Sequence, residues 1–322
     1  MASAIGLPTL GDDLGRVEEA LRRAVASEDA FLTEVSRHLV DAGGKRLRPA
    51  LALAASHAGG REPTEAVVLG GVAVELVHLG SLYHDDVMDQ AATRRSVESV
   101  NARWGNLVAI LAGDFLLAQA SAIASSLGTE VAGLLASTIG RLCEGQVREL
   151  QHLFDVTRSE EAYLRAITGK TAALMATACR VGALTAELPR AQVEALTTYG
   201  ERLGLVFQIV DDVLDVVATD EQLGKPSGKD LLEGVYTLPV IRALADDGAG
   251  PRLRALLGRP VEAPVALEAR DLVRADGAVG AALAVAAVYA DEAADALVPL
   301  GDAPVVKALA GLGHELLAGI PR

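Results

Sequence analysis

Two clusters of acidic residues lie in stretches of the sequence that are otherwise apolar. Both follow the pattern Asp-Asp-x-x-Asp, and they consist of Asp85, Asp86, Asp89, Asp211, Asp212 and Asp215. In a helix the first and last aspartates of this pattern share a face, because residues four apart are neighbours on the helix surface. Carboxylates on an apolar helix lose hydration unless a positive partner compensates. Either cluster alone could be a solvated acidic face, but the recurrence favours two walls of one divalent-cation site.

Magnesium bound to a diphosphate is the ligand that these clusters favour. Mg²⁺ prefers oxygen ligands and usually binds one or two carboxylates plus substrate phosphates. The six histidines do not show the paired spacing of a zinc site. The basic residues that could hold phosphate oxygens are Lys45, Arg48, Arg94, Arg95, Lys170, Lys225 and Lys229. Each of them alone would be an ordinary surface residue, but together they predict an anion pocket.

The composition favours packed helices. Of the 322 residues, 51% are apolar and only 3% are aromatic, with alanine, leucine and valine dominant. The predicted fold class is all-α, and residues 1–322 are expected to form one large helical domain. The net charge of −14 argues against nucleic acid as a partner. It does not exclude an anionic substrate, because a local basic pocket with metal ions can reverse the field.

The two acidic clusters are predicted to lie on long helices. The first helix runs from Pro63-Thr64 to about Gln90, and the second runs from Ala191 to Val217. Three further long helices are expected between them, at residues 107–127, 130–154 and 160–188. The polar stretches 93–103 and 219–236 predict loops that follow the two clusters.

The sequence also predicts a cytoplasmic protein without a stable membrane anchor. Its beginning carries Asp12 and Asp13 and lacks the basic and apolar segments of a signal peptide. The charge-free run from Gly277 to Ala290 is too short to cross a bilayer. Cys143 and Cys179 have neither CxxC nor zinc spacing, so both are expected to be buried, reduced thiols.

Taken together, these residues resemble the trans-isoprenyl diphosphate synthases, a family also called polyprenyl synthetases. The resemblance runs in the family's order from about residue 40 to residue 240. The matching segments are Gly43-Gly44-Lys45-Arg46-Leu47-Arg48-Pro49, His78, His84-Asp85-Asp86-Val87-Met88-Asp89, Arg94-Arg95, Lys170-Thr171, Phe207-Gln208-Ile209-Val210-Asp211-Asp212-Val213-Leu214-Asp215, Gly224-Lys225-Pro226 and Thr237-Leu238-Pro239.

The resemblance implies an isoprenoid synthase-like helical bundle with a central apolar cavity, acting as a homodimer. About three Mg²⁺ ions would be held by Asp85, Asp86, Asp89, Asp211 and Asp215, with Asp212 close by. The allylic diphosphate would contact Arg94, Lys170, Thr171, Gln208 and Lys225. Isopentenyl diphosphate would contact Lys45, Arg48, His78 and Arg95. The implied reaction is ionisation of the allylic diphosphate, condensation with the isopentenyl double bond, and loss of a proton to the departing diphosphate.

Two positions depart from the family's pattern. Val235 stands where the family often has a lysine, so this cation is missing, and Lys229 is a candidate to replace it. Gln146 stands where a glutamate is commoner.

The length of the product is expected to depend on the helix below the first acidic cluster. Ser81 is one helical turn from Asp85, and Val77 continues the same stripe. In the family, large aromatic residues at this level accompany short products, whereas this chain has Gly80 and Ser81. We therefore expect an all-trans product longer than C20. The alternatives are that Gly80 only permits close helix packing, and that the enzyme makes farnesyl or geranylgeranyl diphosphate.

Two other functional classes can be weighed against a synthase. A terpene cyclase pairs one aspartate motif with an Asn/Ser/Glu motif and needs aromatic residues around its cations. The second Asp-Asp-x-x-Asp motif and the scarcity of aromatic residues argue against it. A catalytically silent subunit of a heteromeric synthase would be expected to lose an aspartate motif, and neither is lost.

Overall fold

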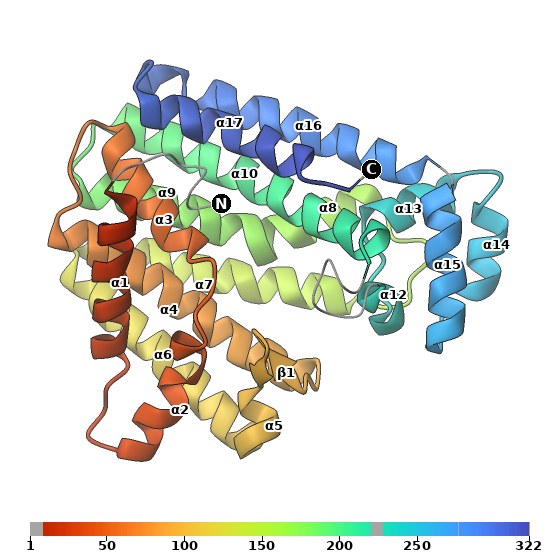
Figure 1. Cartoon of the computed structure of the whole chain (residues 1–322), viewed down its shortest axis with the longest axis horizontal. Helices are drawn as coiled ribbons and strands as arrows, with labels where there is room; N and C mark the ends of the chain where they lie inside the picture. Colours follow the sequence, from red (N-terminus) through yellow and green to blue (C-terminus); the bar gives the residue numbers. More distant parts are fainter. Residues whose placement is uncertain (1–8, 220–227, 276, 322) are drawn as a thin grey trace. The chain divides into compact units, whose positions relative to one another are not determined.

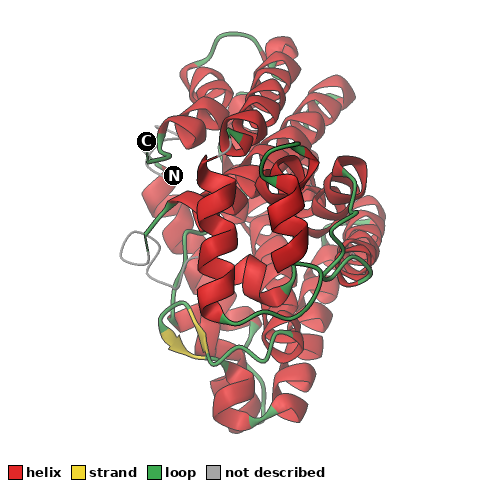
Figure 2. Ribbon diagram, turned by 90° about the vertical axis from the view of Figure 1, so that its right-hand side faces the viewer, coloured by secondary structure: helices red, strands yellow, loops and turns green. Residues whose placement is uncertain are grey.

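The chain folds almost entirely into α-helices. The computed structural model describes residues 9–219, 228–275 and 277–321. Figure 1 shows its helices in chain order, and Figure 2 shows that the strands form one short hairpin. This agrees with the expected all-α fold class.

The elements before residue 140 are mostly long helices with one hairpin between them. They are α1 (Leu10–Ala24), α2 (Ala30–Asp41), α3 (Leu47–Ala58), α4 (Glu65–Met88), β1 (Thr93–Arg94), β2 (Val97–Glu98), α5 (Val100–Trp104), α6 (Asn106–Ser126) and α7 (Thr129–Leu150). The later elements are α8 (Glu160–Ile167), the π-helical turn η2 (Thr168–Ala172), α9 (Ala173–Thr185), α10 (Arg190–Val217), α12 (Lys229–Glu233), α13 (Leu238–Ala245), α14 (Gly250–Leu256), α15 (Ala263–Ala275), α16 (Ala278–Ala296), the 3₁₀ turn η3 (Val298–Leu300) and α17 (Pro304–Ala318).

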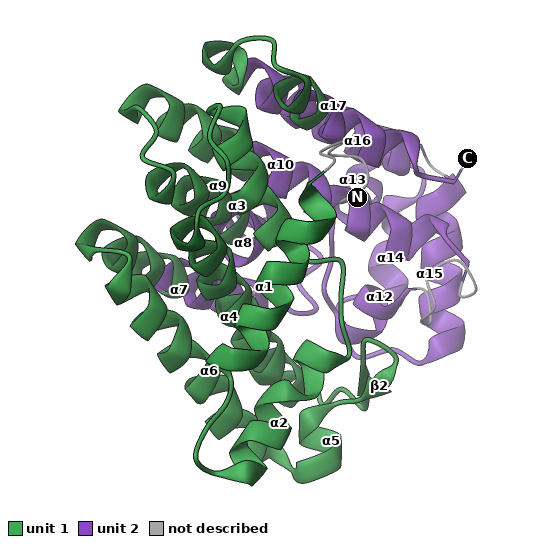
Figure 3. Cartoon of the chain, turned by 60° about the vertical axis from the view of Figure 1, so that its left-hand side comes forward, with its two compact units in different colours: residues 1–139, 174–200, 296–309 green, residues 140–173, 201–295, 310–322 purple. Residues whose placement is uncertain are grey.

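The helices group into two compact units, shown in different colours in Figure 3. Unit 1 comprises residues 1–139, 174–200 and 296–309, and unit 2 comprises residues 140–173, 201–295 and 310–322. The first acidic cluster belongs to unit 1 and the second to unit 2. Each unit is described by itself below, and the expectation of a single domain stays a prediction.

In unit 1, α4 is the helix that carries the first acidic cluster, and it lies in the core. Its start is capped by Thr64, whose side chain accepts a hydrogen bond from the backbone N–H of Val67. Tyr83 is fully buried and donates its hydroxyl proton to the carbonyl of Val35 at 2.7 Å. A Cβ atom built at Gly80 would lie 3.0 Å from the carbonyl oxygen of Gly113. The glycine therefore lets α4 approach α6 closely.

In unit 2, α10 carries the second acidic cluster and packs against α8 and η2 through an apolar core. Ile209 and Val213 on α10 are fully buried in one cluster with Tyr163 and Ile167. Residues 209 and 213 are four apart, so one face of α10 supplies this contact. The acidic residues between and beside them are positioned by this packing.

Several local expectations were wrong. Residues 93–103 are not a simple loop, because they form the β1–β2 hairpin and α5. The helix expected at 160–188 is interrupted by η2, and the loop expected at 219–236 contains α12. Cys179 is buried, but Cys143 is exposed, because its position on α7 points away from the core.

The expectation that no segment could span a membrane is not supported on length and composition alone. Two described helices, α4 and α6, are long and apolar enough, and α15 with the segment 278–300 passes the same test as a bent pair. The apolar stretch of α4 is 72% buried inside the protein, whereas that of α6 is only 33% buried. The low burial of α6 reflects an apolar face that unit 1 does not cover.

Candidate functional site

The first acidic cluster occupies the last turn of α4, and its three carboxylates have different surroundings. Asp85 is partly exposed, Asp89 is exposed at the helix C-cap, and Asp86 is completely buried. Asp86 accepts hydrogen bonds from Arg94, with 2.7 Å between Arg94 Nε and Asp86 Oδ1. Since a buried carboxylate requires such a partner, Arg94 compensates the burial of Asp86 and fixes its position.

Arg94 reaches Asp86 from the β1–β2 hairpin. The two residues at its turn, Arg95 and Ser96, have φ angles of 53° and 63°. Left-handed backbone at both central residues is the geometry of a type I′ turn, which usually contains Asn-Gly. The hairpin thus places two consecutive arginines, Arg94 and Arg95, beside the end of α4.

The other basic residues expected to bind isopentenyl diphosphate also lie in unit 1. Lys45 is exposed, while Arg48 and His78 are partly buried. Burial lowers the pKa of Arg48, and the nearby Glu75 carboxylate acts against this shift. Burial, together with the charges of Arg48 and Arg95, holds the pKa of His78 well below its usual value. His78 is therefore neutral at neutral pH.

The second acidic cluster shows the same division between a buried and an exposed aspartate. Asp211 is exposed, whereas Asp212 is buried and accepts two side-chain hydrogen bonds. The Tyr163 hydroxyl donates to its Oδ2 atom at 2.5 Å, and the Gln208 amide donates to its Oδ1 atom at 2.8 Å. Burial raises the pKa of Asp212 to about 7, although both hydrogen bonds act in the opposite direction. Asp215 is buried and accepts a hydrogen bond from the backbone N–H of Asp230.

Lys170 and Thr171 lie in the π-helical turn η2. Such turns are rare and are frequent at functional sites. The Thr171 hydroxyl donates to Gln208 Oε1 at 2.6 Å, so it joins the hydrogen-bond chain that ends at Asp212. Lys170 donates to Glu149 Oε1 at 2.5 Å. In unit 2 the structure thus brings Thr171 and Gln208 together with Asp212, and it pairs the neighbouring Lys170 with Glu149.

The carboxylate oxygens of the two acidic motifs suit a hard cation that also binds phosphate oxygens. Within the described part of the chain, no group of three or more His, Cys, Asp or Glu residues is arranged to hold a metal ion by itself. Mg²⁺ usually keeps waters and binds one or two carboxylates plus phosphate oxygens. Asp85, Asp89 and Asp211 are the carboxylates that reach the surface and could contribute in this way.

Some expected site residues cannot be placed in this arrangement. Lys225 lies outside the described residues. Lys229 pairs with Glu233 at 2.9 Å on α12. Ser81 is partly buried and donates to the His78 carbonyl, while Val77 is buried in the core. Gly80 contacts Gly113 and Leu117, which favours the alternative that it serves helix packing.

Four residues with strong contacts in these regions were not predicted from the sequence. They are Tyr163, Glu149, Glu75 and Arg46. Glu75 offered one signal, since it is the charged residue in an α4 segment that is otherwise apolar from Ala66 to Val77. Tyr163 offered none, because it lies far from Asp212 in the sequence.

The geometry defines a mainly helical protein in which the second aspartate of each acidic motif is held by side-chain donors, an arginine in the first motif and a tyrosine with a glutamine in the second. Comparison with known proteins identifies its family. The profile of the family described as polyprenyl synthetase matches residues 29–269. The nonaprenyl diphosphate synthase of Mycobacterium tuberculosis is 40% identical over 301 residues, which cover 93% of this chain and 90% of that protein. Component 2 of the heptaprenyl diphosphate synthase of Geobacillus stearothermophilus is 44% identical over 239 residues, or 74% of each chain.

Solved structures agree with this result. A polyprenyl synthase from Caulobacter crescentus CB15, complexed with calcium and isoprenyl diphosphate, has a TM-score of 0.92 at 34% identity. The alignment covers 99% of this chain and 98% of that chain. A geranylgeranyl pyrophosphate synthase from Corynebacterium glutamicum has a TM-score of 0.86 at 40% identity, with 97% and 96% covered.

The chain therefore belongs to the polyprenyl synthetase family and has the all-α isoprenoid synthase fold. It is a prenyltransferase of the trans-polyprenyl diphosphate synthase class, for which the family implies isopentenyl and allylic diphosphates as substrates. This excludes the terpene cyclase considered above.

Proposed function

We propose that the protein is a Mg²⁺-dependent synthase that extends an allylic diphosphate with isopentenyl diphosphate to an all-trans product longer than C20. The observation that carries the proposal is the shared design of the two acidic motifs. In each, the first aspartate reaches the surface, and the second is buried and held by donors, namely Arg94 for Asp86 and Tyr163 with Gln208 for Asp212. Such an arrangement supports metal-bridged binding of a diphosphate.

In this proposal one set of residues binds the allylic diphosphate and another set binds isopentenyl diphosphate. Asp85, Asp86, Asp89, Asp211 and Asp215 would hold about three Mg²⁺ ions together with the allylic diphosphate, and its oxygens would be contacted by Arg94, Lys170, Thr171, Gln208 and Lys225. Lys45, Arg48, His78 and Arg95 bind isopentenyl diphosphate. When bound, Mg²⁺ stabilises the negative charge that develops on the leaving diphosphate.

The side chains position the reactants and exclude water. The allylic C–O bond breaks, the isopentenyl double bond forms the new C–C bond, and the departing diphosphate takes the proton that restores a double bond. A central apolar cavity would shield the allylic cation from water during these steps. No side chain is needed as the final base.

A long product is supported by the small side chain of Ser81, which lies one helical turn from Asp85, where a large aromatic residue would block a prenyl tail. A shorter farnesyl or geranylgeranyl product remains the alternative, because relatives with both long-chain and geranylgeranyl names resemble the chain equally well. The test is mass analysis of the products made from isopentenyl diphosphate with geranyl, farnesyl and geranylgeranyl diphosphate and Mg²⁺. Products beyond C20 support the proposal, products that stop at C15 or C20 identify a short-chain enzyme, and the absence of extension identifies a silent subunit.

The exposed face of α6 supports the proposal of a homodimer. Leu107 is 79% exposed and Leu111 is 66% exposed, which leaves adjacent turns of an apolar helix in contact with water. A second copy is the proposed occupant, because a face this apolar suits an isologous contact. The relative named component 2 points to an unlike second chain as the alternative.

The variant Leu111→Glu is expected to lower the mass of the protein in light scattering from dimer to monomer. Leu267→Glu is the matched control, since Leu267 is 46% exposed on α15 of unit 2. A monomeric wild-type protein would contradict the homodimer.

A further inference from the structure

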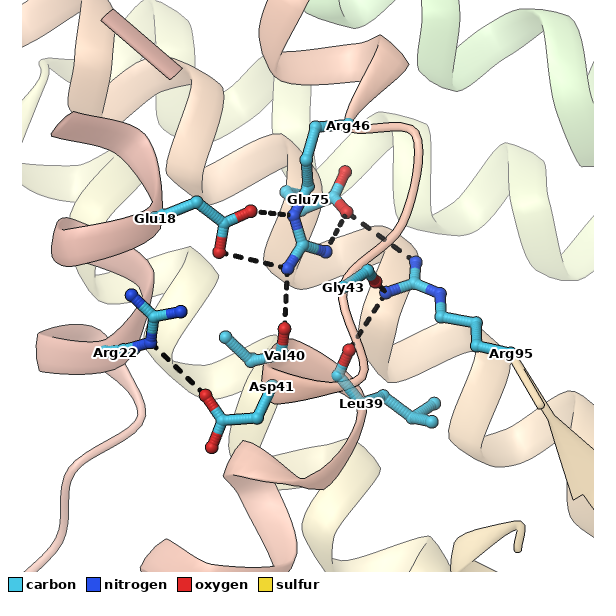
Figure 4. A network of polar contacts seen from close by, with 9 residues as sticks. All are labelled: Glu18, Arg22, Leu39, Val40, Asp41, Gly43, Arg46, Glu75 and Arg95. Atoms are coloured by element: carbon cyan, nitrogen blue, oxygen red, sulfur yellow. Dashed lines mark hydrogen bonds and ion pairs between the residues drawn. The ribbon is translucent and has the colours of Figure 1, made fainter. Parts of the chain in front are cut away.

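Glu75 is a carboxylate on α4 that lies in the core of unit 1 and is contacted by arginines from two other segments. Only 1% of its surface is exposed. Its Oε1 atom accepts a hydrogen bond from Arg46 Nη1 at 3.0 Å and lies 3.8 Å from Arg95 Nη2 (Figure 4). A single buried oxygen thus joins the loop before α3 to the β1–β2 hairpin.

Both arginines have a left-handed backbone conformation that residues other than glycine rarely adopt. Arg46, the residue before α3, has φ 44°, and Arg95 at the hairpin turn has φ 53°. Left-handed backbone is unfavourable at such residues and persists only where surrounding contacts enforce it. Each guanidinium also donates to a carbonyl at the end of α2, Arg46 to Val40 at 2.8 Å and Arg95 to Leu39 at 2.9 Å. Glu75 is the acceptor that the two networks share.

Each of these two arginines directly follows a residue with a proposed role in binding. Lys45 immediately precedes Arg46 and is exposed, while Arg94 immediately precedes Arg95 and holds Asp86. The loop and the hairpin touch directly, since a Cβ atom at Gly44 would lie 2.8 Å from Arg95 Cζ. A shift of either arginine would therefore move the neighbouring cation.

We propose that Glu75 is a positioning residue that maintains the isopentenyl diphosphate pocket by fixing Arg46 and Arg95, and with them the loop that carries Lys45 and the first turn of α3, which carries Arg48. This inference rests on the proposed function, which assigns that pocket. Glu75 does not touch the substrate in this account. It acts through the two arginines.

Positioning and simple electrostatics predict opposite effects for the loss of this charge. Burial lowers the pKa of both Arg48 and Arg95, and the Glu75 carboxylate acts in the opposite direction on each. If the pocket attracted diphosphate only through its net charge, Glu75→Gln would remove a negative charge, leave the pocket more positive and tighten binding. If Glu75 positions the arginines, the same substitution loosens the pocket and weakens binding. The sign of the change therefore decides between them.

The experiment measures KM for each substrate and kcat in Glu75→Gln, with Glu18→Gln as the matched control. Glu18 also pairs with Arg46, whereas its effect on Arg95 is electrostatic and smaller than that of Glu75, so it reports mainly the loss of one arginine contact. We expect Glu75→Gln to raise the KM for isopentenyl diphosphate about tenfold, which corresponds to ~1.4 kcal/mol. The KM for the allylic diphosphate should stay within about twofold of wild type, and Glu18→Gln should show a smaller effect. If Glu75→Gln does not fold, Glu75→Asp provides the same measurement, because it keeps the charge but shortens the reach to both arginines.

Arg48→Gln separates failure of this inference from failure of the proposed function. If Arg48→Gln raises the KM for isopentenyl diphosphate but Glu75→Gln leaves it unchanged or lowers it, the positioning role is refuted and the pocket stands. If the two KM values rise equally in Glu75→Gln, the residue serves overall stability and the inference is also refuted. If Arg48→Gln changes neither KM, the assignment of the pocket falls and the inference falls with it.

Discussion

The substitution Tyr163→Phe tests the hydrogen-bond chain that holds the second acidic motif. It removes only the hydroxyl that donates to Asp212 Oδ2 at 2.5 Å, and it leaves the 2.8 Å bond from Gln208 to Oδ1 in place. A hydrogen bond to a charged group contributes about 1.5–3 kcal/mol. Because Tyr163 is only 1% exposed, water cannot replace the donor. We expect a loss of ~2 kcal/mol in the free energy of unfolding, or roughly 3 °C in Tm for a chain of this length.

The same change should affect the allylic substrate more than isopentenyl diphosphate. Asp212 fixes Gln208, and Gln208 accepts from Thr171, so loss of the tyrosine hydroxyl loosens both proposed contacts to the allylic diphosphate. If about 1 kcal/mol of the lost interaction free energy is lost from binding of the allylic diphosphate, the KM for that substrate rises about fivefold. The assay is steady-state kinetics at a temperature well below both melting transitions.

Tyr199→Phe is the matched control. Tyr199 is equally buried, and its hydroxyl donates to the Leu309 carbonyl at 2.9 Å in unit 1. Its loss should cost about 1 kcal/mol of stability without changing either KM. Equal KM values for the allylic diphosphate in the two variants would refute the role of Tyr163.

The pH dependence of stability gives a second measurement for Tyr163→Phe. The pKa of Asp212 is raised to about 7 in the folded metal-free protein, above its usual value in an unfolded chain. Its stabilising contribution is therefore complete at low pH and declines as the pH rises through about 4 to 7. The Tyr163 hydroxyl bond lowers this pKa, so Tyr163→Phe raises it further and should destabilise the protein more at pH 8 than at pH 5. Urea unfolding at both values checks the sign, and an equal loss at both would contradict it.

Four further predictions address the remaining regions. Ser81→Phe should shorten the product, as seen by mass spectrometry, because it fills the first turn below Asp85; an unchanged product distribution would remove Ser81 from chain-length control. Removal of divalent metal with EDTA should abolish turnover. Asp85→Asn and Asp211→Asn should each lower kcat by about 100-fold or more, since each removes a carboxylate proposed to hold the metal ions on the diphosphate. Near-normal kcat in either variant would contradict the metal-binding role of that aspartate. His78 has a lowered pKa, so it stays neutral in the folded protein while the unfolded chain takes up a proton, and stability should fall as the pH drops below about 6.5. His78→Gln should lack this part of the decline when urea unfolding is measured between pH 7.5 and 5.5. Identical declines in the variant and the wild type would contradict the lowered pKa. Gly80→Ala should lower the free energy of unfolding by about 1–3 kcal/mol, because its Cβ would crowd Gly113 and Leu117 at 3.0–3.1 Å; unchanged stability would show that α4 and α6 can separate without penalty.

The elements that carry the acidic motifs could be predicted from the sequence. The long apolar run that begins at Pro63-Thr64 predicted α4, and its observed bounds, Glu65–Met88, differ from the expectation by a few residues. The same reasoning predicted a helix from Ala191 to Val217, and α10 is observed at Arg190–Val217. The hairpin after α4 was missed because Arg95-Ser96 lacks the Asn-Gly signal that a type I′ turn usually shows, and contacts of the arginine side chain support this turn instead.

The types of the site residues could be predicted, but their partners could not. Lys45 and Arg46 are adjacent and chemically similar, yet Lys45 is exposed and Arg46 is buried against Glu75. The left-handed backbone of Arg46 turns its side chain inward, and local sequence does not predict this conformation. Likewise Asp211 and Asp212 look equivalent in the motif, and only the tertiary contact with Tyr163 distinguishes them.

The most direct test of the central claim is a crystal structure of the protein with Mg²⁺ and a non-hydrolysable allylic diphosphate analogue. The account predicts Mg²⁺ ions that bind oxygens of one diphosphate together with Asp85 or Asp89 from the first motif and Asp211 from the second. Metal and diphosphate bound to only one of the two motifs would contradict it.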